Sequence, residues 1–542
     1  MSNSLMQGQM MNYPLTLAPL LERAAKVFSG REIASRTPDG MHRYTYGDMH
    51  QRVHRLAHAL QRLGLQAGDR VGTLCWNSYR HLELYFAIPC SGMVIHTLNL
   101  RLSADQLAYI INHAGDRVIF ADHSLASLLE PIRALIPRVE QVIILPDSGP
   151  GEYEGLLAES PETPFPWPQL DELTAGATCY TSGTTGNPKS VLYTHRSLVL
   201  HSFGLCLQDT FGFCQRDTIL QLVPMFHANG WGMPWAAVMA GAKLVFSGRQ
   251  LQPADVAWLI ENERPTFTAG VPTIWMGLYS YLESHPHDIS SLTRVCVGGS
   301  ALPRQFVECY SKRYGVPFRL LWGMTETTPI ATVMSLSPED EALPDEERYE
   351  LLARHGMPVP GVDVRIVDDQ GRELAWDGKT MGELQVRGLW VVGGYWQVED
   401  NSPFFSDGWF RTGDVATIDK HGLLQITDRT KDLVKSGGEW ISTVDLENAL
   451  MGHPKVAEAA VIAVFHPKWQ ERPLACVVPQ EEFRNSLTKK EILDYLSTRV
   501  VKWWLPDDVV FIESVPKTSV GKFNKRALRE RFKDYQGHLE TA

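Results

Sequence analysis

The stretch YTSGTTGNPKSVLYTH, residues 180–195, joins a loop of small and hydroxyl-bearing residues to an apolar segment. Glycines let a backbone bend tightly and approach a ligand closely. Several amides and hydroxyls can then point at one centre, which suits phosphate oxygens, and Lys189 adds a positive charge. The stretch therefore predicts a phosphate-binding loop that the following apolar residues fix on a strand.

A solvated surface turn is the alternative, and a generic run of Ser, Gly and Thr would favour it. The order of residues also differs from a Walker A loop, in which four residues separate the glycines and a Gly-Lys pair precedes Ser or Thr. Here only two residues separate Gly183 from Gly186, and Pro188 precedes Lys189. The dense run of Gly and hydroxyl residues that ends in Pro-Lys nevertheless favours phosphate binding.

Short apolar runs alternate with helix-like segments on both sides of this loop. Segment 46–64 carries apolar residues at helical spacing. The expected buried strands are 69–78, 116–124, 140–149, 243–248 and 293–303. Such alternation predicts layered α/β structure with parallel sheets, in which active sites gather beyond the carboxyl ends of the strands.

The composition changes after about residue 361. Residues 361–374, 382–388 and 422–434 are typical of short hairpin strands, and TVDLENALMGHP (443–454) predicts a helix capped by Thr443. The remaining segments predict a small α+β module. We therefore expect an N-terminal domain over 1–427, a hinge over 428–434 and a mobile C-terminal domain over 435–542.

Composition and charge narrow the class of protein. The chain has 542 residues, 44% of them hydrophobic, and a formal net charge of -11, which argues against a general nucleic-acid binder. Eight cysteines without a C-x-x-C pair favour reduced, buried thiols. No secretory signal and no apolar run long enough to span a bilayer is apparent, so we expect a cytoplasmic protein without a transmembrane segment.

Several further segments, together with the loop, resemble the motifs of one protein family. TSGTTGNPK (181–189), PMFHANGWGMP (224–234), WGMTETTP (322–329), WFRTGD (409–414), DRTKDLVKSGGEWIS (428–442) and VPKTSVGKFNKRALR (515–529) resemble, in order, the signature segments of the adenylate-forming superfamily. That superfamily includes acyl-CoA synthetases, adenylation domains of peptide synthetases and firefly-type luciferases. The resemblance implies a large N-terminal domain of layered α/β sheets with a small β-barrel-like subdomain, followed by the small mobile domain.

The resemblance also implies a set of nucleotide and magnesium positions. Residues in the phosphate loop would be Thr181, Ser182, Gly183, Thr184, Thr185, Gly186 and Lys189. Residues around the adenine would be Gly299, Ser300, Ala301, Trp322, Gly323, Met324 and Thr325. Asp414 and Arg429 would bind the ribose and phosphate, and Thr184 and Glu326 would bind Mg²⁺. As isolated residues, these would more commonly be solvated or cap turns.

The catalytic and thiol-binding positions follow from the same motifs. Lys522 would insert its ammonium between the carboxylate of the substrate and the α-phosphate. Lys435 and Gly437, Gly438 and Trp440 of the same segment would approach the pantetheine of CoA in a second arrangement, with Lys431 as the pivot. A hinged domain can exchange such groups by rotating.

His227 would lie beside the carboxylate of the acid, although a lone histidine among apolar residues is more commonly a core residue. Trp231 is either a gate of an acyl tunnel, as in fatty acyl-CoA synthetases, or plain core packing. Ala228 and Val271 complete the expected substrate pocket.

The sequence thus predicts an acid–thiol ligase that makes acyl-AMP from ATP and a medium-chain fatty acid, then acyl-CoA. A short thioether acid or an aryl acid is the next choice, and a carrier protein is the alternative acceptor. A non-catalytic nucleotide sensor is a further alternative, but it would not need Lys522. A homodimer is expected by analogy alone.

Overall fold

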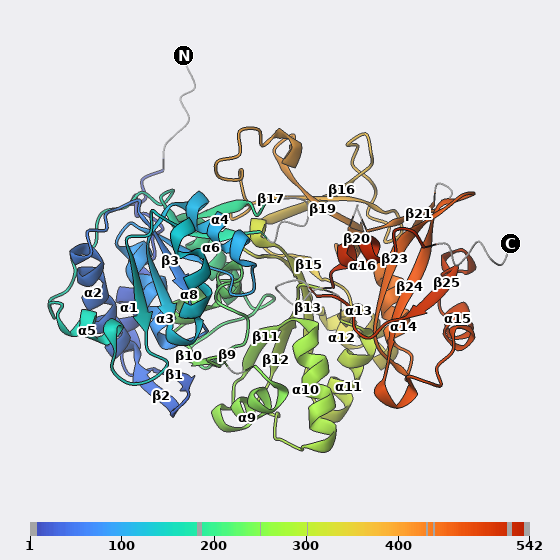
Figure 1. Cartoon of the computed structure of the whole chain (residues 1–542), viewed down its shortest axis with the longest axis horizontal. Coiled ribbons are helices and arrows are strands. Elements are labelled where there is room, and N and C mark those ends of the chain that lie inside the picture. Colours follow the sequence, from blue (N-terminus) through green and yellow to red (C-terminus); the bar gives the residue numbers. More distant parts are fainter. Residues whose placement is uncertain are drawn as a thin grey trace, which may run out of the picture.

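The computed structural model describes residues 8–181, 187–249, 251–300, 302–429, 432–436, 439–517 and 523–535, with the side chains of 439 and 440 left aside. Two sheets form the body of the large N-terminal part (Figure 1). The first has the order β6-β5-β3-β4-β7-β8 in the described chain. Its strands are β3 (Arg70–Leu74), β4 (Val94–Thr97), β5 (Asp116–Asp122), β6 (Gln141–Leu145), β7 (Ala175–Tyr180) and β8 (Ser190–Thr194).

The second sheet has the order β15-β14-β13-β12-β11-β9-β10-β1-β2. Its strands are β1 (Glu32–Thr37), β2 (Gly40–Thr45), β9 (Thr218–Gln221), β10 (Lys243–Phe246), β11 (Phe267–Gly270), β12 (Arg294–Val297), β13 (Phe318–Gly323), β14 (Ile330–Val333) and β15 (Met357–Pro358). Pairing is parallel from β1 through β10, β9, β11 and β12 to β13. The predicted parallel α/β architecture is confirmed.

Helices cover these sheets where the sequence shows helical periodicity. Helix α2 (Tyr46–Arg62) begins with a capping box between Thr45 and Asp48, and it buries Val53 and Leu56 on its inner face. Other long helices of the body are α1 (Ala18–Val27), α3 (Tyr79–Cys90), α4 (Ala104–Ala114), α6 (His195–Cys206), α8 (Met233–Ala240), α9 (Pro253–Glu263), α10 (Pro272–Ser284) and α11 (Arg304–Tyr314). Helix α2 agrees with the helix expected over 46–64 to within two residues.

A third sheet links the body to the C-terminal part. It consists of β16 (Val362–Val367), β17 (Gly382–Gly388), β18 (Phe405–Ser406), β19 (Trp409–Ile418) and β20 (Leu424–Arg429), all paired antiparallel. Asp414 on β19 pairs with Arg429 on β20. This register brings two predicted nucleotide residues together.

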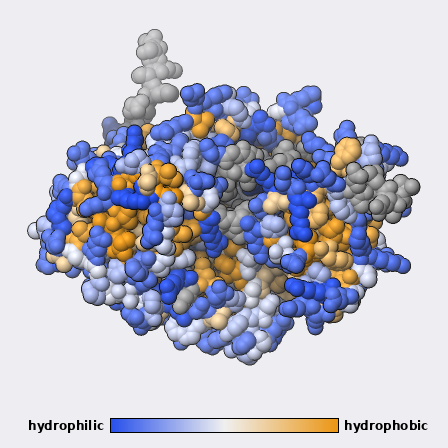
Figure 2. All heavy atoms as spheres, viewed as in Figure 1, coloured by the Kyte–Doolittle hydropathy of each residue, from blue (hydrophilic) through white to orange (hydrophobic). Residues whose placement is uncertain are grey.

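The C-terminal elements lie on the right in Figure 1 and have a core of their own. The strands are β21 (Val434–Ser436), β22 (Glu439–Ile441), β23 (Val456–His466), β24 (Gln470–Pro479) and β25 (Asp508–Phe511); the helices are α14 (Thr443–Met451), α15 (Lys489–Ser497) and α16 (Lys525–Arg531). In Figure 2 hydrophilic residues cover much of the rim of this view, and hydrophobic residues gather on either side of its middle.

One expected helix cap is wrong. Ser442, not Thr443, caps α14, because its side chain accepts a hydrogen bond from the amide of Asp445 at 3.1 Å. Thr443 is the first helical residue, and its hydroxyl donates to the Asp428 carboxylate at 2.5 Å. The Thr443 hydroxyl, which the sequence assigned to the helix cap, is therefore engaged in a contact with Asp428 at the hinge.

Candidate functional site

A cavity of about 250 Å³ lies between the N-terminal body and the C-terminal elements. Predicted adenine and ribose residues line it together: Gly299, Ser300, Trp322, Gly323, Met324, Asp414 and Arg429. They come from the ends of β12 and β13 and from β19 and β20, which lie far apart in the sequence. The fold thus brings most of the predicted nucleotide positions to one cavity, here called the nucleotide cavity.

Asp414 is held by donors from two different sheets, Trp322 on β13 and Arg429 on β20. The indole Nε1 of Trp322 donates to Asp414 Oδ2 at 2.8 Å, and Arg429 Nε lies 3.3 Å from Asp414 Oδ1. An ionised carboxylate has about four lone-pair sites, so these two partners leave it able to accept further hydrogen bonds. The Asp414 carboxylate is therefore fixed in place and can accept hydrogen bonds from the hydroxyl groups of a sugar.

Glu326 lies in a short turn after β13, and only 6% of its surface is exposed. Its Oε1 accepts a 2.5 Å hydrogen bond from the Tyr395 hydroxyl. Burial raises the pKa of the Glu326 carboxyl, while Tyr395, Arg429 and Lys189 act in the opposite direction. A cation beside this carboxylate would offset the cost of its burial.

Lys189 lies close to the same turn. Its ammonium is 4.6 Å from the centre of the Phe404 ring and 5.3 Å from that of Tyr395. The two ends of the predicted phosphate loop are joined, because the Thr181 amide donates to the Lys189 carbonyl at 2.9 Å and the Lys189 amide to Thr181 Oγ1 at 3.2 Å. Hydrogen bonds therefore hold the end of β7 and the start of β8 together on the two sides of the loop.

Several predicted residues lie outside the described part of the chain. They are Ser182, Gly183, Thr184, Thr185, Gly186, Ala301, Lys431, Gly437, Gly438 and Lys522, and for Trp440 the side chain is not described. Their roles stay predictions. Thr325, which is described, accepts a hydrogen bond from the Tyr193 hydroxyl to its carbonyl at 2.8 Å.

A second cavity, of about 220 Å³, has a mostly apolar lining and includes His227, Trp231 and Val271. We call it the apolar cavity. Its other lining residues are Arg101, Leu222, Val223, Pro224, Phe226, Leu251, Pro253, Val256, Gly270, Thr273 and Ile274. Trp231 is 4% exposed and also belongs to the main core, while Ala228 follows His227 at the start of α7 (Ala228–Trp231). Thr273, near the start of α10, lines both cavities.

The two lysine-bearing segments of the C-terminal part lie differently. Phe523, Asn524 and Lys525, which directly follow Lys522, line the nucleotide cavity. Lys435 lies on β21, where its amide donates to the Glu471 carboxylate at 2.8 Å, and it is not among the residues that line that cavity. In this arrangement residues 523–525, and not Lys435, lie at the cavity.

Sequence reasoning missed Tyr395 and the hydroxyl of Thr443. Tyr395 lies 69 residues from Glu326, in a stretch of apolar, aromatic and glycine residues. A buried carboxylate needs a hydrogen-bond donor, but nothing in the sequence says which residue supplies it. Only the fold pairs them.

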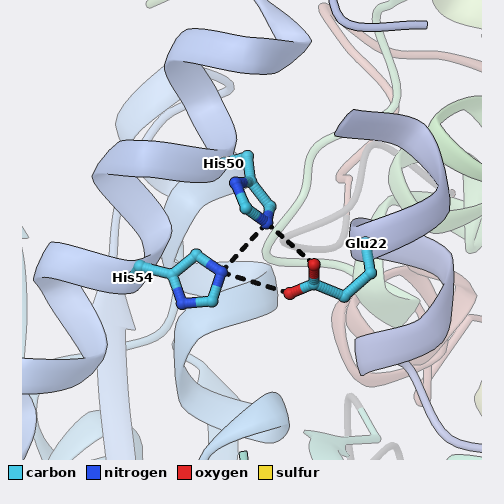
Figure 3. A group of neighbouring side chains, drawn as sticks. All are labelled: Glu22, His50 and His54. Atoms are coloured by element: carbon cyan, nitrogen blue, oxygen red, sulfur yellow. Dashed lines mark hydrogen bonds and ion pairs between the residues drawn. The ribbon is translucent and has the colours of Figure 1, made fainter. Parts of the chain in front are cut away.

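A cluster of ionisable groups lies on α1 and α2 (Figure 3). Glu22 Oε2 is 3.1 Å from His50 Nε2, Glu22 Oε1 is 3.1 Å from His54 Nε2, and the two Nε2 atoms are 2.9 Å apart. Three such ligand atoms resemble a metal site. However, His54 Nδ1 accepts the Phe165 amide at 2.8 Å, so neutral His54 carries its proton on Nε2, where a metal would need a lone pair. The three side chains therefore fit a hydrogen-bonded contact between α1 and α2 better than a metal site.

We expect Glu22→Gln to lower the free energy of unfolding at pH 7 by about 1–2 kcal/mol, since bonds to this charged group are lost at a partly exposed position. Hydrogen bonds from His50 and His54 hold the pKa of Glu22 well below its usual range. Its contribution is therefore present above the unfolded pKa, about 4.3, and is lost as the pH falls further. Urea denaturation at pH 7 and pH 3 measures this.

Glu159→Gln is the matched control, because Glu159 is exposed and lies 3.6 Å from Arg62. We expect its effect to stay within about 0.5 kcal/mol at both pH values. A loss for Glu22→Gln that grows between pH 4 and pH 3 would contradict the assignment.

The layered body, the small terminal domain and the cavity between them define the adenylate-forming class of fold. The chain belongs to the AMP-binding enzyme family: the family model described as AMP-binding enzyme matches residues 21–396, and the one described as AMP-binding enzyme C-terminal domain matches residues 445–522. The predicted family and fold class are confirmed. In the described ranges, no helix is long and apolar enough to cross a membrane.

Relatives match over nearly their full length. A long-chain-fatty-acid–CoA ligase of Thermus thermophilus is 47% identical, with 97% of each chain covered. A 3-methylmercaptopropionyl-CoA ligase of Ruegeria pomeroyi is 44% identical, covering 98% of this chain and 99% of the relative. A medium-chain-fatty-acid–CoA ligase of Ectopseudomonas oleovorans is 42% identical, with 98% of both covered.

Solved structures share the fold. The crystal structure of ATP-bound MatB from Rhodopseudomonas palustris has a TM-score of 0.82 and 28% sequence identity, and the match covers 96% of this chain and 99% of that one.

Proposed function

We propose that this protein is an acyl-CoA ligase that activates a carboxylic acid with ATP and transfers the acyl group to CoA through an acyl-adenylate. The observation that carries the proposal is that Thr273 lines both the nucleotide cavity and the apolar cavity, so the two cavities lie on either side of one residue. A carboxylic acid whose chain occupies the apolar cavity would thereby present its carboxylate toward the nucleotide. Relatives named as CoA ligases, up to 47% identical, support it.

In the first half-reaction, a carboxylate oxygen attacks the α-phosphorus of ATP. A P–O bond forms, the bond to the β-phosphate oxygen breaks, and pyrophosphate leaves with its electron pair. Asp414 and Trp322 are proposed to hold the ribose side, and Lys189 with loop residues 181–186 is proposed to bind the pyrophosphate. Positioning and charge neutralisation supply most of the rate enhancement in phosphoryl-type transfers.

Glu326 fits the role of a magnesium ligand that the family implies. Its carboxylate offers hard oxygen donors, and the burial that raises its pKa is offset when a divalent cation lies beside it. Thr184 is the second proposed ligand. Bound Mg²⁺ neutralises charge on the phosphate oxygens.

In the second half-reaction, the sulfur of CoA attacks the acyl carbon and AMP leaves. A free thiol has a pKa of about 8.5, so its thiolate is a minority at neutral pH and must be well placed. Lys435, Gly437, Gly438 and Trp440 are proposed to approach the pantetheine after the C-terminal domain rotates about the hinge near Lys431. His227 is proposed to lie beside the acyl carboxylate.

A medium-chain fatty acid is our first choice of substrate, because the apolar cavity is lined mainly by aliphatic and aromatic groups. A short thioether acid is the second choice, since the Ruegeria relative is named for one. An aryl acid is a third, and a carrier protein remains the alternative acceptor. A homodimer is proposed by analogy with fatty acyl-CoA synthetases alone, and a cytoplasmic location is proposed from the sequence.

We expect Trp231→Ala to move the chain-length preference toward longer acids. Removing the indole enlarges the apolar cavity, and each methylene that then fits changes kcat/KM by about tenfold. The measurement is kcat/KM for a series of acids of increasing length. Trp258→Ala is the control, because Trp258 is 37% exposed on α9 and should leave the preference unchanged. An unchanged preference in Trp231→Ala would show that Trp231 only packs the core.

The proposed activity is tested by screening carboxylic acids for AMP release that requires both ATP and CoA. Exchange of labelled pyrophosphate into ATP, dependent on an added acid, tests the first half-reaction alone. Product analysis with CoA or a carrier protein separates the two acceptors. Absence of acid-dependent exchange across the series would leave the nucleotide sensor as the better assignment.

A further inference from the structure

A buried cluster joins the hinge to the segment that follows Lys522. Lys525 is 8% exposed, and its Nζ lies 2.9 Å from Glu447 Oε1. The same ammonium donates to Thr443 Oγ1. Thr443 in turn donates to Asp428 Oδ2 through both its hydroxyl, at 2.5 Å, and its amide, at 2.8 Å. We call these four residues the hinge cluster.

We propose that Lys525 is a positioning residue for adenylation: through Thr443 and Asp428 it fixes residues 523–525, which directly follow Lys522 in the chain, against the nucleotide cavity. The inference rests on the proposed function, because adenylation is the step that Lys522 is proposed to serve. Lys525 acts through its neighbours in the chain and in the hinge cluster.

The cluster spans the two sides of the hinge. Asp428 belongs to β20 and pairs with Val415 of β19, next to Asp414 in the nucleotide cavity. Thr443 and Glu447 belong to α14, and Lys525 begins α16, so these three move with the C-terminal part. The contacts of Asp428 with Thr443 can therefore form only in one orientation of the C-terminal part relative to β19, the strand that carries Asp414.

A second contact acts in the same direction. Arg529, one turn along α16 from Lys525, forms an ion pair with Asp432, just after the hinge pivot. Phe523, Asn524, Lys525 and Arg529 all line the nucleotide cavity. Helix α16 thus contacts Asp432 directly through Arg529 and Asp428 indirectly through Thr443, and its first residues lie at the cavity.

The charges favour a fixed ammonium. Burial lowers the pKa of Lys525, but the carboxylates of Glu447 and Asp428 outweigh burial and raise it overall. Lys525 therefore stays charged at neutral pH, and its ammonium is bonded to Glu447 and Thr443. Rotation of the C-terminal part would separate Thr443 from Asp428 and leave the buried Asp428 carboxylate without these two hydrogen bonds, which disfavours the rotation.

The test compares the two half-reactions in Lys525→Met. Acid-dependent exchange of pyrophosphate into ATP reports adenylation, and thioester formation from supplied acyl-adenylate and CoA reports the second step. We expect exchange to fall about tenfold or more and thioester formation to change by less than about threefold, since only the first step needs the placed segment. Lys525→Arg should restore most of the exchange.

A second variant tests the same role if Lys525→Met folds poorly, and a third serves as a control. Thr443→Val removes the bridging hydroxyl without changing charge, and it should reduce exchange with the same sparing of the second step. Lys489→Met is the matched control, because the Lys489 ammonium bonds Asp508 at 2.8 Å on the surface of the same domain; neither step should change.

Equal losses in both half-reactions, in variants that unfold at the wild-type temperature, would overturn the positioning role. Full exchange activity in Lys525→Met and Thr443→Val would overturn it as well. Failure of the wild-type protein to show any acid-dependent exchange would instead count against the proposed function, so the two failures are distinct.

Discussion

Lys522→Ala is expected to reduce acyl-adenylate formation by about 100-fold or more while sparing thioester formation from supplied acyl-adenylate. The substitution removes the positive charge that Lys522 is proposed to supply where the carboxylate meets the α-phosphate. The expected loss appears in acid-dependent pyrophosphate exchange. The second half-reaction, measured by CoA consumption with a supplied acyl-adenylate, should proceed at close to the wild-type rate.

The position of Lys522 in the chain supports this prediction. Phe523, which follows Lys522 directly, lines the nucleotide cavity. Among the described lysines and arginines that line it, Arg429, Lys525 and Arg529 each have a carboxylate partner, and Arg526 lies there as well. We therefore expect the ammonium of Lys522 to add positive charge beside the crowded phosphates.

Lys517→Ala is the matched control for this prediction. Lys517 lies on the same segment, and its ammonium bonds the Glu458 carboxylate at 2.6 Å. We expect both half-reactions to stay within about twofold of the wild-type rates, because surface ion pairs contribute little. Equal loss of both half-reactions in Lys522→Ala would be inconsistent with a role in adenylation alone.

Local patterns in the sequence predicted the elements well where local forces decide them. Helix α2 follows from apolar spacing and from the capping pair Thr45 and Asp48, which lie three residues apart. The buried strands β3, β5 and β6 follow from short apolar runs that end in polar turns. In these segments the residues that determine the structure are neighbours in the chain.

Prediction was weaker where partners lie far apart in sequence. Ser442 and Thr443 are equally good caps by composition, and only the position of Asp428, 15 residues away, draws the Thr443 hydroxyl into the hinge cluster. The hydrogen bond from Tyr395 to Glu326 depends on the packing of the third sheet against the body. Such pairings follow from tertiary structure, which motif spacing does not contain.

The resemblance predicted residue roles that local chemistry could not. Gly299, Trp322 and Asp414 have nothing in common by spacing, yet they line one cavity. The nature of the acid is less accessible, because the apolar cavity is built from separate segments around β9, α7 and α10. Its size depends on how these segments pack, so chain-length preference could not be read from the motifs.

Glu326→Gln is expected to lower adenylation by about 100-fold at low Mg²⁺ and to raise the Mg²⁺ concentration needed for half-maximal rate. Glutamine keeps the shape of the side chain and can still accept the Tyr395 hydroxyl, but it carries no charge for a cation. The measurement is pyrophosphate exchange at a series of Mg²⁺ concentrations. Binding of ATP in EDTA, where no cation is present, should be unchanged by the substitution.

Glu399→Gln serves as the control, because Glu399 is exposed in the loop that follows Tyr395. Its Mg²⁺ dependence should match that of the wild-type protein. Tyr395→Phe separates charge from positioning: it removes the hydrogen bond to Glu326 but keeps the carboxylate, so we expect a loss of about tenfold or less. An identical Mg²⁺ dependence in Glu326→Gln and wild-type protein would mean that Glu326 holds the turn after β13 and does not bind the cation.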